Sequence, residues 1–302
     1  MIKICVILGP TASGKTSLSL ELAKKYNGEI VSADSRQIYR EMDIGSAKVS
    51  GVWKGGVLFV DEVAHHMIDI VQPDTPYSLA QYQRGAVACL QEIALRGKLP
   101  FLVGGTGLYI ASIVDNYVIP QGSPDNSLRA SLDSMNNEQL LAKLKILSPQ
   151  TAQKIDVKNK RRLVRALEVA MKTGKEFVTL RQKAEPIFDT LQIGVSVDRA
   201  ELVKRIDVRV DEMVETGLEN EVRELMKKYS VDLPSMSGIG YRQMAQYING
   251  EISLDDAIAL IKRDTRRYAK RQMTWFKRDK RIHWVSKAVE ASVLIDEFVN
   301  HK

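Results

Sequence analysis

The chain has 302 residues, 44% of them hydrophobic and 27% charged, which is the composition of a globular protein with one large domain or two modest ones. No apolar run approaches the roughly 20 residues of a membrane-spanning helix, and two cysteines, Cys5 and Cys89, in apolar surroundings predict a reducing compartment without a disulfide or zinc framework. The formal net charge of +7 suggests an anionic partner.

The first predicted element is a strand from Ile2 to Leu8, followed by a glycine-rich turn and a helix from Ser17 to Lys25. The short apolar run is typical of a buried parallel strand. Because the chain enters this strand at once, we expect no signal peptide. The turn has the pattern of a phosphate-binding loop. Its residues are Gly9, Pro10, Thr11, Ala12, Ser13, Gly14, Lys15 and Thr16.

The residue types of this loop suit an anion. Gly9 and Gly14 adopt backbone angles that other residues resist, so successive N–H groups and the helix start can point at a phosphate. Lys15 supplies a mobile charge for the terminal phosphate, and Thr16 offers a hydroxyl to Mg²⁺. A chance glycine-rich turn is the alternative, which the flanking strand and helix disfavour. The loop predicts binding of a diphosphate or polyphosphate, but it does not identify the reaction.

Two further strands are predicted to end beside this loop. One, from Glu29 to Ala33, leads to Asp34, and the other, from Leu99 to Val103, leads to the turn from Gly104 to Gly107. In an open α/β sheet, ligands sit beyond the carboxyl ends of the strands, and alternating strands and helices predict a parallel sheet. Asp34 could therefore be a base, a Mg²⁺ ligand or the N-cap of a helix from Ser35 to Glu41.

The segments between these strands carry weaker signals. Residues 43–48 have the character of a loop, and residues 49–62 carry little information. His65 and His66 have no third metal ligand nearby, so we expect them to pack or to form hydrogen bonds within the core. A helix is predicted over residues 78–96.

The pattern changes after the first three strands. Pro120, Gly122 and Pro124 predict a linker, and residues 127–183 read as helices, with leucines at helical spacing. A strand is predicted again at residues 191–197. The predicted organisation is an α/β core formed by residues 1–119 and 189–302, with a helical insertion subdomain formed by residues 120–188.

Two helices of the C-terminal part carry basic residues. Asp198 begins the first, with Glu201 completing a capping box, and Arg205 and Arg209 lie on one face of it. The last long helix spans about residues 253–277 and carries a basic stripe interleaved with aromatic residues, with few acidic residues in its second half. A solvated face is the plainer interpretation, but a stripe of one sign favours nucleic acid. The stripe consists of Arg263, Arg267, Lys270, Thr274 and Lys277.

Eight stretches form a combination that is more specific than the phosphate loop alone. They are Gly9–Thr16, Ser32–Ser35 with Gln37 and Tyr39, Asp43–Lys48, His65–Asp69, Gly104–Tyr109, Arg165–Val169, Gly240–Gln243 and Lys270–Phe276. Together, in this order and over nearly the whole chain, they resemble the tRNA dimethylallyltransferases, also called tRNA isopentenyltransferases, of the bacterial type.

The resemblance implies an α/β fold, a P-loop NTPase-like parallel sheet core with an inserted all-helical subdomain. It implies transfer of a dimethylallyl group from dimethylallyl diphosphate, held by the phosphate loop with Mg²⁺ on Thr16, to N6 of the adenine 3′-adjacent to the anticodon in tRNA. Asp34 matches the general base, and Thr106 and Arg209 match positions near the reacting centre and the diphosphate. The residues that the resemblance implies for tRNA binding are Asp34, Ser35, Arg36, Gln37, Thr106, Arg129, Arg161, Arg162, Arg165, Gly240, Tyr241, Arg242, Arg267, Lys270, Arg271 and Lys277.

The sequence departs from the family pattern at a few positions. Ser46 and Val49 stand where the family commonly has Thr and Pro, and Arg161 stands where it commonly has Gln. No cysteine follows Cys89, so the zinc finger of eukaryotic members is not expected. We expect a bacterial-type enzyme that acts in the cytoplasm as a monomer, without a membrane partner.

Three other functions compete with this one. An adenylate dimethylallyltransferase would use a free nucleotide, but the basic helix and the helical insertion favour a large RNA. A P-loop kinase of a small metabolite would fit the loop and Asp34, but the strand from Leu99 to Val103 lacks the acidic end expected of a Walker B strand. A nucleotide switch or RNA-binding protein without activity is disfavoured by the convergence of Asp34 and Thr106.

Overall fold

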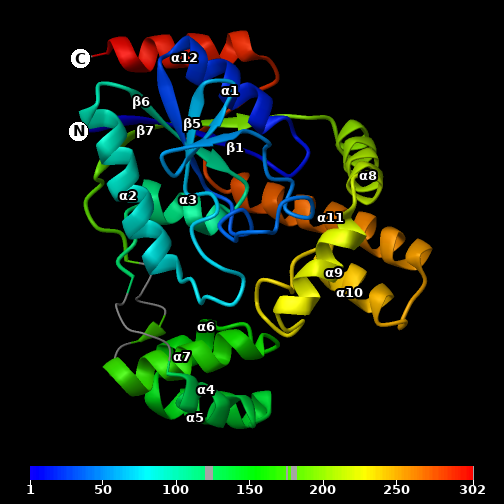
Figure 1. Cartoon of the computed structure of the whole chain (residues 1–302). Helices are drawn as coiled ribbons and strands as arrows, with labels where there is room; N and C mark the ends of the chain where they lie inside the picture. The colour runs from blue at the N-terminus through cyan, green and yellow to red at the C-terminus, as the bar shows by residue number, and fades with distance from the viewer. Residues whose placement is uncertain (120–124, 175, 178–181, 302) are drawn as a thin grey trace. The chain divides into compact units, whose positions relative to one another are not determined.

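The computed structural model describes residues 1–119, 125–174, 176–177 and 182–301 (Figure 1). The expected linker residues Pro120, Gly122 and Pro124 lie outside these ranges. The helices and strands are, in chain order, β1 (Ile2–Leu8), α1 (Lys15–Lys25), β2 (Gly28–Ser32), β3 (Val52–Lys54), β4 (Val57–Val60), β5 (Val63–His66), α2 (Leu79–Leu95), β6 (Leu99–Gly104), α3 (Gly107–Val114), α4 (Asn126–Asp133), α5 (Asn137–Leu147), α6 (Pro149–Lys154), α7 (Lys160–Thr173), β7 (Phe188–Val195), α8 (Arg199–Glu215), α9 (Leu218–Lys228), α10 (Tyr241–Ile248), α11 (Leu254–Phe276), β8 (Ile282–Val285) and α12 (Ala288–Asn300).

The chain divides into two compact units. The first combines Met1–Val114 with Ile187–Lys302, and the second is Asp115–Pro186. The helical segment expected at residues 120–188 overlaps the second unit. No helix in the described part of the chain is both long and apolar enough to cross a membrane.

The first unit is built on one eight-stranded sheet of order β3-β4-β5-β2-β6-β1-β7-β8. Strands β5, β2, β6, β1, β7 and β8 run parallel, whereas β3 and β4 pair in antiparallel fashion at one edge. The predicted α/β fold with a mainly parallel sheet is confirmed. The central strands are continuous apolar runs because both faces of a parallel sheet are covered.

Two hydrophobic clusters cover the two faces of this sheet. Ile4, Val6 and Leu8 of β1 pack in the cluster that contains α2 and α3, whereas Cys5 and Ile7 pack in the cluster that contains α1 and α12. Side chains along a strand point alternately to opposite faces, so one short run serves both clusters. Figure 1 shows α1 and α12 side by side, with α2 and α3 elsewhere on the sheet.

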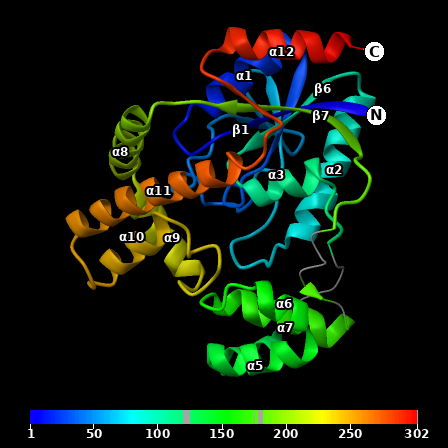
Figure 2. The same ribbon diagram turned by 180° about the vertical axis from the view of Figure 1, so that it is seen from behind.

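A third hydrophobic cluster joins helices α8 to α11 to the turns that follow β2. It includes Val210 of α8, Met244 of α10, Ile261 of α11 and Met42 of the turns. At the other end of α11, Phe276 packs in the sheet cluster with α2 and α3. Figure 2 shows α8, α9 and α10 gathered along the first part of α11. The long helix therefore connects this helical group to the face of the sheet that α2 and α3 cover.

The second unit has a hydrophobic core of its own. Leu140 and Leu144 of α5 pack with Leu163 and Leu167 of α7, as the leucine spacing predicted. Within the described residues of this unit the regular elements are the helices α4 to α7. The helices expected in the insertion are thus present in its described part, where Lys183 also forms an isolated antiparallel bridge with Tyr117.

Two local predictions were wrong. The helix considered for Ser35–Glu41 is absent from the described structure, which has turns at residues 35–38 and 40–41 and an isolated β-bridge between Tyr39 and Val71. Asp198 does cap α8, accepting the N–H groups of Ala200 and Glu201. Glu201 does not complete a capping box, because its carboxylate accepts from Arg205 Nε at 2.7 Å.

Other elements were not predicted at all. The hairpin β3–β4 lies in the segment 49–62 that carried little information, and β3 is exposed along its length. Strand β8 and helix α12 follow α11, which is therefore not the last long helix. The two histidines have the structural role we expected. His65 Nδ1 lies 3.0 Å from Val63 O, and His66 Nε2 lies 2.7 Å from Glu29 Oε2.

Candidate active site

The carboxyl ends of three neighbouring strands, β2, β6 and β1, meet at one edge of the sheet. Leu8 is in register with Gly104, and Ser32 with Val103, so the strands end at the same level. The phosphate loop follows β1, Asp34 follows β2 and the turn with Thr106 follows β6. This is the arrangement that the order of strands and helices predicted.

The phosphate loop leads directly into α1. Ser13 N–H donates to Pro10 O at 3.3 Å, and Leu18 N–H donates to Gly14 O at 3.1 Å as the helix begins. Gly14, the N-cap, has a left-handed φ of 92°, and in the described structure no side chain caps this helix start. Ala12 has a φ of 61°, a strained conformation for a residue with a side chain. Such a helix start with free N–H groups is suited to an anion.

Lys15 is the partly buried cation of the loop, and its Nζ donates to Pro10 O at 2.6 Å. Burial lowers the pKa of Lys15 to about 8; the charge of Asp34 raises that pKa, and the charge of Arg209 lowers it. A poorly solvated ammonium group gains from the approach of an anion. The loop is therefore arranged for a ligand with negative charge.

Asp34 and Thr106 are held by bonds between their two loops. The Asp34 carboxylate accepts from Arg36 N–H at 2.8 Å, which forms a local turn. Thr106 N–H donates to Ala33 O at 3.1 Å, and the Thr106 hydroxyl oxygen accepts from Ser35 N–H at 3.1 Å. These bonds fix the residues on either side of Asp34 and leave the carboxylate at the edge of the cavity described below.

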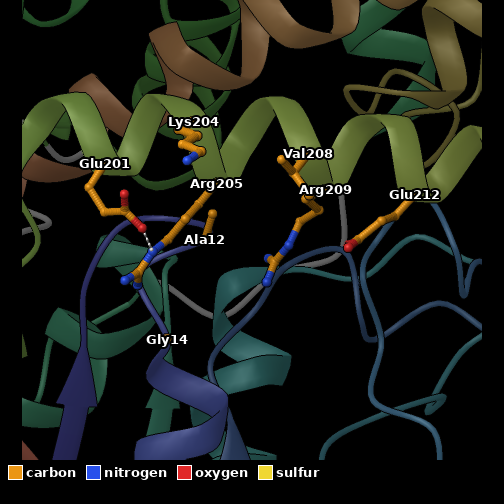
Figure 3. A pocket seen from close by; sticks show the side chains of 8 residues that line it. All are labelled: Ala12, Gly14, Glu201, Lys204, Arg205, Val208, Arg209 and Glu212. Carbon is orange, nitrogen blue, oxygen red and sulfur yellow. Dashed lines mark hydrogen bonds and ion pairs between the residues drawn. The ribbon is translucent and has the colours of Figure 1, made fainter.

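Helix α8 brings basic side chains to the phosphate loop. Figure 3 shows Arg205 and Arg209 extending from α8 toward the side of Ala12 and Gly14, around a cavity of about 330 Å³. Arg205 is paired with Glu201. Burial lowers the pKa of Arg209 below its ordinary value, so this guanidinium is also poorly solvated. A second desolvated cation thus lies beside Lys15.

A larger cavity of about 710 Å³ lies between the strand ends and α11. Its lining includes predicted residues of the phosphate loop, of the Asp34 turn and of the C-terminal helices. From the first two groups these are Thr11, Lys15, Thr16, Asp34, Ser35, Arg36 and Gln37. From the C-terminal helices and their connecting loop they are Arg209, Gly240, Arg242, Arg267 and Arg271.

The basic stripe expected on α11 is exposed at all five of its positions. At the start of the stripe, Asp264 pairs with Arg263 at 3.0 Å, with Arg242 at 3.1 Å and with Arg267 at 3.7 Å. Lys270 and Lys277, also predicted as tRNA contacts, lie on the same exposed face. The helix therefore presents positive charge along one side.

Other predicted tRNA contacts have side chains that are engaged elsewhere. Tyr241 is only 1% exposed, and its hydroxyl donates to Glu221 Oε1 at 2.8 Å. Its side chain therefore lies in the protein interior, behind the cavity wall to which Gly240 and Arg242 belong. In the second unit, Arg129 and Arg165 both pair with the buried Glu168. Burial raises the pKa of Glu168. Hydrogen bonds, including those from the two arginines, outweigh this effect and lower that pKa to about 2.

The second unit keeps two basic side chains nearer to solvent. Arg161 is exposed and Arg162 is partly exposed at the start of α7. The N–H of Arg162 donates to the Asn159 side chain, which caps this helix. These arginines are therefore presented by a fixed helix start.

Supporting residues of the site were missing from the predicted set. Glu221 of α9 accepts three backbone N–H bonds from residues 43–45, in addition to the Tyr241 hydroxyl. These N–H partners lie 176 to 178 positions away in the sequence, so no local pattern could have revealed them. Tyr268 and Gln272 of α11 also line the cavity, and burial raises the pKa of Tyr268 to about 12.

The residues present fit a magnesium ion that is bound mainly by a ligand's phosphates. Within the described ranges no cluster of three or more His, Cys, Asp or Glu side chains could hold a metal ion. The Thr16 side chain lies at the cavity, beside the loop that would hold the phosphates. Mg²⁺ commonly takes one or two protein oxygens and completes its shell with phosphate oxygens and water.

The fold and the site together define a P-loop α/β protein in which the phosphate-loop motif, Asp34 and the basic helix α11 line one cavity. Residues 37–279 match the family model described as IPP transferase, and residues 2–51 match the model described as isopentenyl transferase. The chain belongs to the tRNA dimethylallyltransferase, or IPP transferase, family.

Curated relatives resemble the chain over nearly its whole length. The tRNA dimethylallyltransferase 2 of Geotalea uraniireducens is 46% identical over 292 residues, which cover 94% of this chain and 92% of the relative. The tRNA dimethylallyltransferase of Heliobacterium modesticaldum is 44% identical over 287 residues, covering 92% and 88%.

Solved structures agree with this assignment. The tRNA isopentenylpyrophosphate transferase of Bacillus halodurans is 37% identical, with a TM-score of 0.73 and coverage of 99% of this chain and 97% of that one. A eukaryotic dimethylallyltransferase acting on tRNA is 26% identical, with a TM-score of 0.80 and coverage of 99% and 78%.

The desolvated Lys15 predicts a pH dependence of anion binding. Above pH 8 the free protein loses the Lys15 proton, whereas a bound anion favours the charged form, so binding must take up a proton. We expect the Kd of inorganic pyrophosphate, measured by calorimetry, to rise about five- to tenfold from pH 8 to pH 9 relative to Lys15→Arg, which stays charged. If the ratio of the pyrophosphate Kd of the wild-type protein to that of Lys15→Arg stayed constant with pH, this prediction would be contradicted.

Proposed function

We propose that this chain transfers a dimethylallyl group from dimethylallyl diphosphate to N6 of the adenine 3′-adjacent to the anticodon in tRNA and releases diphosphate. The observation that carries the proposal is the single cavity shared by the phosphate loop, Asp34 and α11. A diphosphate site, a candidate base and a basic helix at one cavity are what this reaction requires. The names of the relatives support the same reaction.

Asp34 is proposed as the general base. The exocyclic nitrogen of adenine is a poor nucleophile because its lone pair is delocalised into the ring, so a carboxylate that accepts its proton helps it to attack. The Asp34 carboxylate lines the cavity and lies near Lys15, where it is close to the diphosphate site. Thr106 is proposed to act beside it, held through Ser35.

The leaving diphosphate is proposed to be stabilised by Lys15, Arg209 and the amides at the start of α1. The allylic carbon tolerates positive charge, so the difficult part of the reaction is charge development on the departing oxygen. Cations that are already desolvated stabilise that charge without reorganising solvent. Mg²⁺, when bound at Thr16 and the diphosphate, would add Lewis-acid stabilisation of the same oxygens.

The tRNA is proposed to bind along α11 and the rim of the cavity. The exposed Arg267, Lys270 and Lys277 would contact phosphates, while Arg36 and Arg242 at the cavity would lie closer to the flipped adenine. Flipping a base requires a few kcal/mol, which backbone contacts along a basic surface offset. In the second unit, Arg161 and Arg162 are the favoured tRNA contacts, because Arg129 and Arg165 are already paired with Glu168.

The other candidate functions have less support. A kinase of a small metabolite would not need the exposed stripe of α11, and the relatives are named as tRNA-modifying transferases. A transferase acting on a free nucleotide would also leave that stripe without a partner. The reaction itself is therefore the first test.

The first expected outcome concerns the reaction. Radiolabelled dimethylallyl diphosphate incubated with the protein, unmodified tRNA and Mg²⁺ should give labelled RNA, and omission of Mg²⁺ should suppress the transfer. No label should pass from the γ-phosphate of ATP to small metabolites. Phosphoryl transfer without prenyl transfer would instead support the kinase.

The second concerns Asp34. Asparagine keeps the size of the side chain and can still accept the Arg36 N–H bond, but it cannot take a proton. We expect Asp34→Asn to melt and to bind tRNA like the unmodified protein, while its single-turnover rate falls about 10²- to 10⁴-fold. A rate close to that of the unmodified protein would leave Asp34 with a turn-forming role alone.

The third concerns the basic stripe. Arg267→Ala combined with Lys270→Ala should weaken tRNA binding and make its salt dependence shallower by roughly one unit per lost phosphate contact. Lys24→Ala combined with Lys25→Ala is the matched control, because it removes the same charge from the last turn of α1, far along that helix from the phosphate loop. Equal effects of the two pairs would show that only net charge matters.

A further inference from the structure

Gln272 of α11 makes two backbone hydrogen bonds that join loops of the site. Its Oε1 accepts from the N–H of Thr11 in the phosphate loop at 2.9 Å. Its Nε2 donates to the carbonyl of Gly105, in the turn after β6, at 2.8 Å. The side chain is only 6% exposed; its bond to Gly105 is buried, and its bond to Thr11 is partly buried.

The two partners fix the orientation of the amide. A backbone N–H can only donate and a backbone carbonyl can only accept, so Gln272 must place its oxygen at Thr11 and its nitrogen at Gly105. A glutamine is therefore matched to this place, whereas methionine, of similar size, would satisfy neither backbone group. Leaving such buried groups unpaired is unfavourable.

The absence of a side chain at position 105 allows this contact. A Cβ built on Gly105 would lie 2.4 Å from Gln272 Nε2, too close for both to keep their positions. Gly105 is not among the residues of positive φ, so its backbone conformation is open to alanine. Glycine is thus needed here for the close approach of Gln272.

We propose that Gln272 is a positioning residue that sets the spacing between the diphosphate-binding loop and the turn of Gly105 and Thr106, which is hydrogen-bonded to the residues beside Asp34. Thr11 lies four positions before Lys15, and Gly105 lies directly before Thr106. This inference rests on the proposed function, because it concerns the distance between the leaving group and the base. A misplacement of about 1 Å between reacting groups can lower a rate by about 10²-fold.

The same bonds attach the proposed RNA-binding helix to the site of chemistry. Lys270 is exposed on the outer face of α11, two residues from the buried Gln272. The helix that presents the basic stripe is thereby hydrogen-bonded to the loop for the other substrate. Gln272 thereby fixes the position of the proposed tRNA-binding helix relative to the proposed diphosphate-binding loop.

The test compares Gln272→Met with Gln192→Met in the full-length protein. Gln192 is a second buried glutamine, 3% exposed in β7 and outside the lining of the cavity, so it controls for the loss of a buried amide. With both substrates saturating, we expect Gln272→Met to lower the single-turnover rate by about 10- to 100-fold while the Kd for tRNA stays within about twofold. Gln192→Met should keep the rate of the unmodified protein.

A rescue experiment addresses the same contact from the loop. Gly105→Ala alone should lower the rate, because its methyl group displaces Gln272. In a Gln272→Ala background the space is vacant, so Gly105→Ala should cause no more than about twofold further loss, which is strong non-additivity. Additive losses, or a Gln272→Met rate equal to that of Gln192→Met, would overturn the inference. Failure of the unmodified protein to transfer label would overturn the proposed function instead.

Discussion

The whole site depends on how closely the ends of β2 and β6 approach each other. Ala33 N–H donates to Val103 O at 2.7 Å, and Ala33 O accepts from Thr106 N–H at 3.1 Å. A Cβ on Gly104 would lie 2.2 Å from Ala33 O, so a side chain at this position would push the strands apart. Because the two backbones are joined at this point, Asp34 and Thr106 emerge side by side.

The phosphate loop and α8 contribute two poorly solvated cations, Lys15 and Arg209, which would be stabilised by a bound anion. Burial lowers the pKa of Lys15 and that of Arg209. The negative charge of Asp34, the residue proposed to accept a proton in the reaction, raises the pKa of Lys15 against this effect of burial. A diphosphate would give these cations a partner, and its departure is the step that they are placed to assist. Binding of one substrate and activation of its leaving group thus use the same groups.

Helix α11 serves two purposes because its opposite faces differ. At 3.6 residues per turn, the exposed basic positions fall on one side, while Ile261, Gln272 and Phe276 are buried on the other. The outer face carries the charge that attracts RNA, and the inner face packs on the sheet and the helical group. A single rigid element therefore relates the surface for a large substrate to the loop for a small one.

The amino-acid sequence by itself determined the phosphate loop, the order of strands and helices and the two faces of α11. These features depend on residues within one or two turns of each other, and the parallel sheet follows from the alternation of elements. The hairpin β3–β4, strand β8 and helix α12 were missed because short or weakly patterned segments become regular only when they pack on the sheet.

Only the tertiary structure decided which polar side chains act in support of the site. Glu221 and Gln272 bind backbone groups of segments that are far away in the chain, and no local pattern names those partners. In the same way, packing buried Tyr241 and paired Arg129 with Glu168, although the resemblance had placed both on the tRNA. The physical reason is that a hydrogen bond between segments far apart in the chain exists only once the hydrophobic clusters have fixed their distance.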